Sequence, residues 1–123
     1  MTSVFPMSIS QLANAADTSV YVVRNYTLEG LLECRKSPNN GYGLYEEPAL
    51  ERLRLIRRAL DAGLSLCEIR PLIKAIRGRD RQEMVSVIEV LHNKIQASQQ
   101  RLRNLDQVLM RLPEQPHKYL KTI

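Results

Sequence analysis

The sequence is short of the residues on which several protein classes depend. It has no tryptophan, one phenylalanine and two cysteines, Cys34 and Cys67, which lie far apart and form no Cys-x-x-Cys pair. We therefore expect reduced thiols. No apolar run approaches the roughly 18 residues of a membrane helix, and residues 1–7 are too short for a signal peptide. These absences predict a cytoplasmic protein that does not enter a membrane.

Catalytic motifs are also absent. The sequence contains no glycine-rich phosphate loop, no His-Glu-x-x-His and no supported Ser/His/Asp set. We expect neither an enzyme nor a bound cofactor.

Positive charge is concentrated in the middle of the chain. The net charge is +5, but residues 1–50 carry three Lys/Arg against five Asp/Glu, a net of −2. Residues 51–81 carry nine against four, a net of +5. A basic helix face fits an anionic partner such as nucleic acid, and it is equally compatible with solvated surface.

A heptad seam follows the basic block. Eight of its nine positions are apolar: Met84, Ile88, Leu91, Ile95, Leu102, Leu105, Leu109 and Leu112, with Ser98 as the polar exception. The steps alternate four and three with no Gly or Pro between them, which predicts one long helix. A chain of this length cannot cover so long a stripe, so we expect a coiled-coil homodimer. The alternative is a core helix in a monomeric bundle.

The N-terminal third has the pattern of two short helices joined by a turn. Ser10 is a candidate cap for a helix over 10–16, Asp17-Thr18 forms the turn, and Ser19 is a candidate cap for the second helix. Gly30 stands where that helix would end in a left-handed residue. This arrangement predicts a helix-turn-helix.

A β-hairpin is expected next. Asn40-Gly41 is a strong turn pair, and the flanking segments would form a wing with Arg35, Lys36, Asn39 and Asn40 at its tip. Those side chains could bind phosphate or be ordinary loop residues.

Two more helices should precede the seam. Glu46, Glu47 and Pro48 suit a helix start, and Gly63 ends that helix. Ser65 to Glu68 forms a capping box for the next helix, in which Pro71 predicts a kink or a shortened first segment. The expected organisation is a winged helix-turn-helix domain with a two-helix extension over 8–77, a dimerisation helix over 81–112, and a tail over 113–123. The fold class is mainly α.

Several segments resemble the MerR family of transcription regulators. Val22–Leu32 resembles the family's IRYYE..GLL motif, Asn40–Tyr45 resembles its GYRxY wing, and Leu50–Ile69 resembles its second helix pair. The resemblance covers roughly 8–112, in the family's order and spacing. It implies a dimer whose two recognition helices read a pseudo-palindromic promoter element in double-stranded DNA, beside RNA polymerase.

The resemblance also implies roles for individual residues. The recognition helix maps to 19–27: Ser19 and Tyr21 would face the major groove, Arg24 would grip a phosphate, and Tyr26 would seat the helix. The remaining expected DNA contacts are Asn25, Arg35, Lys36, Asn39 and Tyr42. Alternatives are a core role for Tyr26 and a local acidic partner for Arg24.

Two positions depart from the family pattern. Asp17 stands where the turn normally has Gly, and Gly43 replaces the wing arginine after Gly-Tyr. Asp tolerates the left-handed conformation at some cost. A lost phosphate contact lowers affinity and flattens its salt dependence, so we expect weak DNA binding.

Within the family, the chain resembles co-regulators or repressors of mercury-resistance operons. The resemblance therefore implies a co-regulator or repressor of a mercury-resistance or other stress-resistance operon. Metal-sensing members carry thiols around the ends of the dimer helix. Here residues 79–83 and 113–117 have none, and His92 and His117 are single. We expect no metal site of the family type.

Two other functions fit the residues. The chain could be an interaction module that heterodimerises with, or antagonises, another regulator of the family. Cys67, in the first turn of a helix, could instead be a thiol-based sensor.

Overall fold

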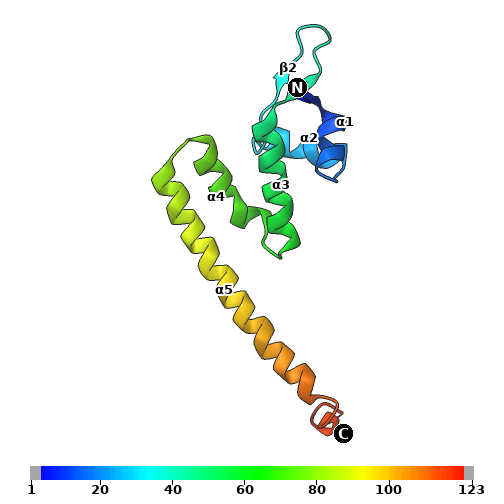
Figure 1. Cartoon of the computed structure of the whole chain (residues 1–123), viewed down its shortest axis with the longest axis vertical. Coiled ribbons are helices and arrows are strands. Elements are labelled where there is room, and N and C mark those ends of the chain that lie inside the picture. Colours follow the sequence, from blue (N-terminus) through cyan, green and yellow to red (C-terminus); the bar gives the residue numbers. More distant parts are fainter. Residues whose placement is uncertain (1–3, 121–123) are drawn as a thin grey trace. The chain divides into compact units, whose positions relative to one another are not determined.

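The computed structural model describes residues 4–120. Contacts divide the chain into two compact units, Met1–Met84 and Val85–Ile123. Short strands and four helices make up the described part of the first unit, and most of one long helix lies in the second (Figure 1). In chain order the elements are β1 (Met7–Ser8), α1 (Ile9–Ala15), α2 (Val20–Leu28), β2 (Arg35–Lys36), β3 (Gly43–Tyr45), α3 (Glu47–Asp61), α4 (Leu66–Arg77), α5 (Arg81–Arg111) and the 3-10 helix η1 (Pro116–Lys118).

Serine caps set the starts of the first two helices. Ser19 caps α2 as predicted, because its Oγ accepts the Val22 N–H at 3.1 Å. The prediction that Ser10 caps α1 is wrong. Ser8 is the cap: its Oγ accepts the Gln11 N–H at 3.2 Å, and Gln11 Oε1 accepts the Ser8 N–H at 2.9 Å. This reciprocal bond, in which Gln11 accepts from the Ser8 N–H, decides between the two serines, because the residue three positions after Ser10 is Ala13, which has no side-chain acceptor.

Two left-handed residues shape the helix-turn-helix. Asp17 has φ +55° in the turn between α1 and α2, as expected for a position at which glycine is favoured. Gly30 has φ +79° directly after the cap of α2 and so ends that helix, also as expected. Together they fix where the chain enters and leaves the second helix of the motif.

The wing is part of a three-stranded antiparallel sheet in the order β1-β3-β2. Arg35 pairs with Leu44, and Met7 pairs with Tyr45 on the other side of β3. The hairpin prediction is confirmed, although Arg35 and Lys36 lie in β2 rather than at the tip. β1 was not predicted, because two residues are too few to show an alternating pattern.

Helices α3 and α4 follow the sequence signals closely. Pro48 lies in the first turn of α3, and Ser65 and Glu68 form the predicted capping box of α4. The expected shortening at Pro71 does not occur, since α4 runs through it from Leu66 to Arg77. Pro71 removes one N–H donor, and the strong cap and the buried face of α4 maintain the helix around it.

The core of the first unit lies between these helices and the sheet. Leu12 of α1, Val23 of α2, and Leu53 and Ile56 of α3 are all fully buried. Val23 anchors α2 from one side, so the opposite side of that helix is left open.

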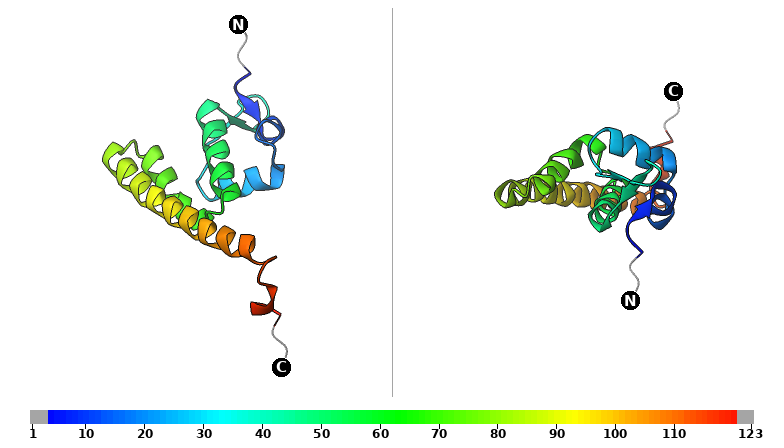
Figure 2. Two further views of the ribbon diagram at one scale, coloured as in Figure 1. Left: turned by 60° about the horizontal axis from the view of Figure 1, so that its bottom comes forward. Right: turned by 90° about the horizontal axis from the view of Figure 1, so that it is seen from above.

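The long helix α5 has 31 residues, begins at Arg81 as expected and ends at Arg111, one residue before the expected end (Figure 1 and Figure 2). Asp80 caps it, with its Oδ1 accepting the Glu83 N–H at 3.0 Å. Arg79, with φ +53°, makes the turn out of α4. At about 1.5 Å per residue, the helix is about 46 Å long. The fold class is confirmed: mainly α, with a small wing and a long final helix.

Candidate nucleic-acid interface

Helix α2 exposes one side to solvent. Val20, Val23 and Tyr26 pack toward the core, whereas Tyr21 is 70% exposed and Arg24 is also exposed. A spacing of three places Tyr21 and Arg24 on the same side of a helix. Among residues 4–120, no carboxylate lies within ion-pair distance of Arg24. The exposed side of α2 therefore offers an aromatic ring and an available guanidinium.

Other predicted residues of this helix are less open. Ser19 is exposed at the helix start, with its hydroxyl committed to the cap. Asn25 is half-buried, and Tyr26 is a partly buried residue packed against the core cluster. The core role considered for Tyr26 is therefore present, and it is compatible with seating the helix.

The wing presents its predicted residues to solvent, with one of them already engaged. Lys36 and Asn39 are exposed, and Tyr42 is 74% exposed. Arg35 is exposed too, but its Nη2 lies 3.2 Å from Glu46 Oε1, and its Nε donates to the same oxygen at 3.3 Å. Any phosphate contact by Arg35 must compete with that carboxylate.

A hydrogen bond that the sequence did not reveal joins the recognition helix to the wing. Thr27 Oγ1 on α2 lies 2.8 Å from the Tyr45 hydroxyl at the end of β3, and Thr27 Oγ1 also donates to the Val23 carbonyl at 2.7 Å. Tyr45 is buried, and burial raises the pKa of its phenol above the ordinary value. The bond fixes the wing against α2.

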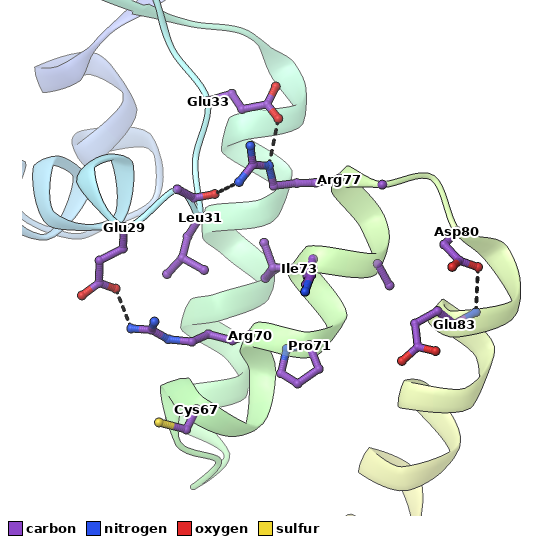
Figure 3. A pocket seen from close by; sticks show the side chains of 14 residues that line it. Glu29, Leu31, Glu33, Cys67, Arg70, Pro71, Ile73, Arg77, Asp80 and Glu83 are labelled. Atoms are coloured by element: carbon purple, nitrogen blue, oxygen red, sulfur yellow. Dashed lines mark hydrogen bonds and ion pairs between the residues drawn. The ribbon is translucent and has the colours of Figure 1, made fainter.

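Two acidic residues, one at the end of α2 and one in the segment after it, bind arginines of the next helix pair. Glu29 Oε2 lies 2.8 Å from Arg70 Nη2, and Glu33 Oε1 lies 3.0 Å from Arg77 Nε (Figure 3). Arg52 of α3 approaches the same Glu33 oxygen at 3.5 Å. The hydrogen bond from Arg77 is the main cause of a lowered pKa at Glu33. These arginines of the basic block therefore bind protein carboxylates.

Four of these residues, Glu29, Glu33, Arg70 and Arg77, line a hollow of about 1210 Å³ within the first unit. Its wall includes Leu31 and Ile73, both buried, as well as Cys67 (Figure 3). Cys67 lies in the first turn of α4 as expected, and both cysteines are exposed. In the described part of the chain, no cluster of three His, Cys, Asp or Glu residues could hold a metal ion.

The predicted seam lies along α5, except that Leu112 is one residue past the end of the helix. Five of its apolar residues are exposed, Leu91 is buried, and Met84 and Leu112 are half-buried. Leu102 is 64% exposed, and it is one of a row of exposed apolar residues, which is more informative than a single exposed leucine. The exposed seam residues are Ile88, Ile95, Leu102, Leu105 and Leu109. None of the helices within 4–120 is long and apolar enough to span a membrane.

Family models match most of the chain. The model described as "MerR HTH family regulatory protein" matches residues 7–76, and the model described as "MerR, DNA binding" matches residues 50–114. Together these segments contain the helix-turn-helix, the wing, α3, α4 and all of α5.

Curated relatives are similar over nearly the whole length. The HTH-type transcriptional regulator MerD of Acinetobacter calcoaceticus is 32% identical over 116 residues, covering 94% of this chain and 96% of the relative. The MerD of Pseudomonas aeruginosa has the same identity over 115 residues, covering 94% and 95%. The regulator ZntR of Escherichia coli K12 is 28% identical over 107 residues, covering 85% and 76%.

Solved structures support the same fold. HiNmlR, described as a MerR family regulator lacking the sensor domain and bound to promoter DNA, aligns with a TM-score of 0.72 and 23% identity, covering 94% of this chain and 95% of that one. PbrR691 from Ralstonia metallidurans CH34, solved in complex with lead(II), aligns with a TM-score of 0.58 and 33% identity over 88% and 86%.

Proposed function

Because the chain belongs to the MerR family of helix-turn-helix regulators and is a DNA-binding transcriptional regulator, we propose that it acts as a dimer on a pseudo-palindromic promoter element. We further propose that it is a co-regulator or repressor of a mercury-resistance or other stress-resistance operon. The family is non-enzymatic. RNA polymerase at the promoter, and another regulator of the family, are the proposed partners.

The observation that carries the DNA-binding proposal is the open side of α2. Arg24 is exposed there without a carboxylate partner in the described chain, and Tyr21 stands beside it. Val23 is buried on the opposite side of α2, so the exposed side of the helix can enter a major groove without rearrangement of the core. Ser19, Asn25, Lys36, Asn39 and Tyr42 are the further proposed contacts, with Arg35 available when it leaves Glu46.

The subgroup proposal is supported by the extent of similarity to MerD, which spans α1 to the end of α5 in this chain. Mercury resistance and repression are carried over from that similarity as proposals. A reporter fused to a mercury-resistance promoter, with and without this chain, tests them. Reduced expression supports repression, and unchanged expression at every mercury concentration contradicts it.

Gel-shift and anisotropy titrations test DNA binding. A duplex selected by the protein from a random-sequence pool should bind in a salt-dependent manner, and Arg24→Ala should weaken binding and reduce the slope of log affinity against log salt by about 1. Arg103→Ala is a matched control, because Arg103 is exposed on α5 and donates to Gln100. Equal effects of both variants would contradict a specific role for Arg24.

One feature of the structure is compatible with the heterodimer alternative. The seam of α5 is apolar and exposed in a single chain, so the helix of a different regulator can cover it as well as a second copy can. Mixing this chain with a MerD or ZntR protein carrying a distinct tag tests that alternative. Co-purification of the two chains supports heterodimers, and exclusive recovery of each protein with its own kind supports the homodimer.

The thiol-sensor alternative rests on the exposed position of Cys67 in α4. Blocking the thiol with an alkylating reagent should then change DNA binding in the wild type and not in Cys67→Ser. Equal binding before and after alkylation removes this alternative.

A further inference from the structure

The end of the recognition helix and the segment after it are joined to α4 by two side-chain pairs. Glu29 reaches Arg70 across 41 positions of sequence, and Glu33 reaches Arg77 across 44. Arg77 Nη1 also donates a hydrogen bond to the Gly30 carbonyl. Arg70 and Arg77 are seven residues apart on α4, two helical turns, and so share one side of it.

Two buried apolar residues lie between the charged residues in sequence, one on each side of the connection. Ile73, midway between Arg70 and Arg77, is 1% exposed, and Leu31, between Glu29 and Glu33, is 5% exposed. All six residues line the same hollow (Figure 3). Two ion pairs therefore flank two buried apolar side chains. Together the ion pairs resist rotation of the end of α2 about α4, which a single contact would permit.

We infer that Glu29, Glu33, Arg70 and Arg77 are positioning residues, a clamp that sets the angle of the recognition helix against α4 and thereby the half-site spacing that the dimer prefers. This inference rests on the proposed function. The ion pairs are roughly half exposed, and pairs of that kind contribute little to stability, whereas they can fix geometry when they act together.

The position of the clamp explains why it would influence spacing. Arg77 is the last residue of α4, and only Gly78, Arg79 and Asp80 separate it from α5. The same helix that holds the end of α2 therefore leads directly into the proposed dimerisation helix. A loosened clamp would let each recognition helix adopt a range of angles, so DNA with the wrong half-site spacing would be penalised less.

The test uses the Glu29–Arg70 pair in the full chain. Glu29→Arg, Arg70→Glu and the double exchange are compared on two duplexes: the one that wild-type protein selects from a random pool, and the same duplex with one base pair inserted between half-sites. The measured quantity is the ratio of the two affinities. We expect each single variant to reduce that ratio by about fivefold, at the lower end of typical coupling between sites, and the double exchange to restore most of it.

The control is the Glu51–Arg54 pair, whose side chains are similarly exposed and 3.4 Å apart within α3. Glu51→Arg should leave the ratio unchanged, because that pair joins no two elements. Circular dichroism and thermal unfolding of every variant separate positioning from folding. A role in stability alone would lower both affinities equally and leave their ratio unchanged.

The possible failures are distinguishable. If the wild type selects no duplex, the proposed function fails and the clamp has no role on DNA. In a second case the wild type selects a duplex and binds it more tightly than the duplex with the inserted base pair. If Glu29→Arg and Arg70→Glu then give the same affinity ratio as the wild type, the clamp inference is wrong and the proposed function stands. The clamp inference is also wrong if Glu51→Arg changes the affinity ratio as much as Glu29→Arg does.

Discussion

The Thr27 hydroxyl on the recognition helix and the Tyr45 hydroxyl at the end of the wing are 2.8 Å apart, and Tyr45 is buried. This bond connects two elements that would approach DNA from the same domain. Its loss should affect both stability and the order of the wing, because a buried hydroxyl without a partner carries a desolvation cost.

Thr27→Val should lower the free energy of unfolding by about 1–3 kcal/mol, the cost of leaving a buried polar group unsatisfied. Denaturant unfolding monitored by circular dichroism measures the change. Tyr45→Phe removes the other hydroxyl, and in the double variant the two costs should be less than additive. Full additivity would show that Thr27 and Tyr45 do not interact in solution.

The raised pKa of Tyr45 gives a pH dependence at the alkaline end. The phenol is buried, so its proton is held more tightly in the folded chain than in the unfolded chain, whose pKa is about 10. The associated stability is complete below pH 10 and is lost as the pH rises through the folded pKa. Unfolding midpoints should therefore fall above pH 10 in the wild type, and less in Tyr45→Phe. Parallel pH profiles for the two proteins would contradict this.

Glu46→Gln should strengthen DNA binding. The substitution removes the carboxylate that lies 3.2 Å from the Arg35 guanidinium, so Arg35 becomes available to DNA. An exposed ion pair of this kind contributes little to the free energy of unfolding, so its loss should leave the fold intact. We expect affinity to rise by about twofold to fivefold in anisotropy titrations at low salt. Glu47→Gln is the matched control, with the same charge change one residue away. An equal rise in both variants would indicate a net-charge effect with no part for Arg35.

Leu105→Lys should shift the chain toward monomer. Leu105 is an exposed seam residue of α5, and a lysine there would be desolvated in a coiled coil. The dimer dissociation constant from sedimentation equilibrium should rise by at least about tenfold, equivalent to about 1.4 kcal/mol. Met110→Lys, at a more exposed position off the seam, should have no such effect. A wild type that sediments as a monomer would overturn the proposed dimer.

Asp17→Gly should stabilise the helix-turn-helix. Asp17 adopts φ +55°, where glycine has no steric penalty, and part of that gain is offset by the greater freedom of glycine when unfolded. We expect the free energy of unfolding to rise by about 0.5–1 kcal/mol. Asp17→Asn, which also tolerates this conformation, should be close to neutral. A destabilised Asp17→Gly would reveal a stabilising role for the carboxylate.

The sequence predicted the elements whose cause is local. Ser19, Gly30 and the Ser65–Glu68 box act within a few residues, so their patterns can be recognised directly and the structure has them as expected. The seam of α5 repeats over many helical turns, so its periodicity predicts the long helix, and the structure contains that helix. Ser10 was misassigned because Ser8 competes for the same role and Gln11 decides between them.

The contacts of the candidate interface were less predictable. Thr27 and Tyr45 are 18 positions apart, and Glu29 and Arg70 are 41 positions apart, so no periodicity relates the partners. The charge pattern leaves open whether the basic block meets an anionic partner or solvent, whereas in the structure Arg52, Arg70 and Arg77 bind carboxylates that precede them by many residues. Such pairings depend on how α3 and α4 fold back on the end of α2. The exposure of Tyr21 and Tyr42, by contrast, agrees with their predicted positions on the recognition helix and the wing.

The central place of β3 in the sheet limits how this domain can be re-engineered. Its residues pair with Arg35–Lys36 on one side and with Met7–Ser8 on the other, and Ser8 also begins α1. The hairpin is thus not a self-contained cassette. A chimera that exchanges only residues 35–45 with those of another regulator would pair Met7 and Ser8 with a strand of different sequence. A working chimera must therefore exchange the segment before α1 together with the wing.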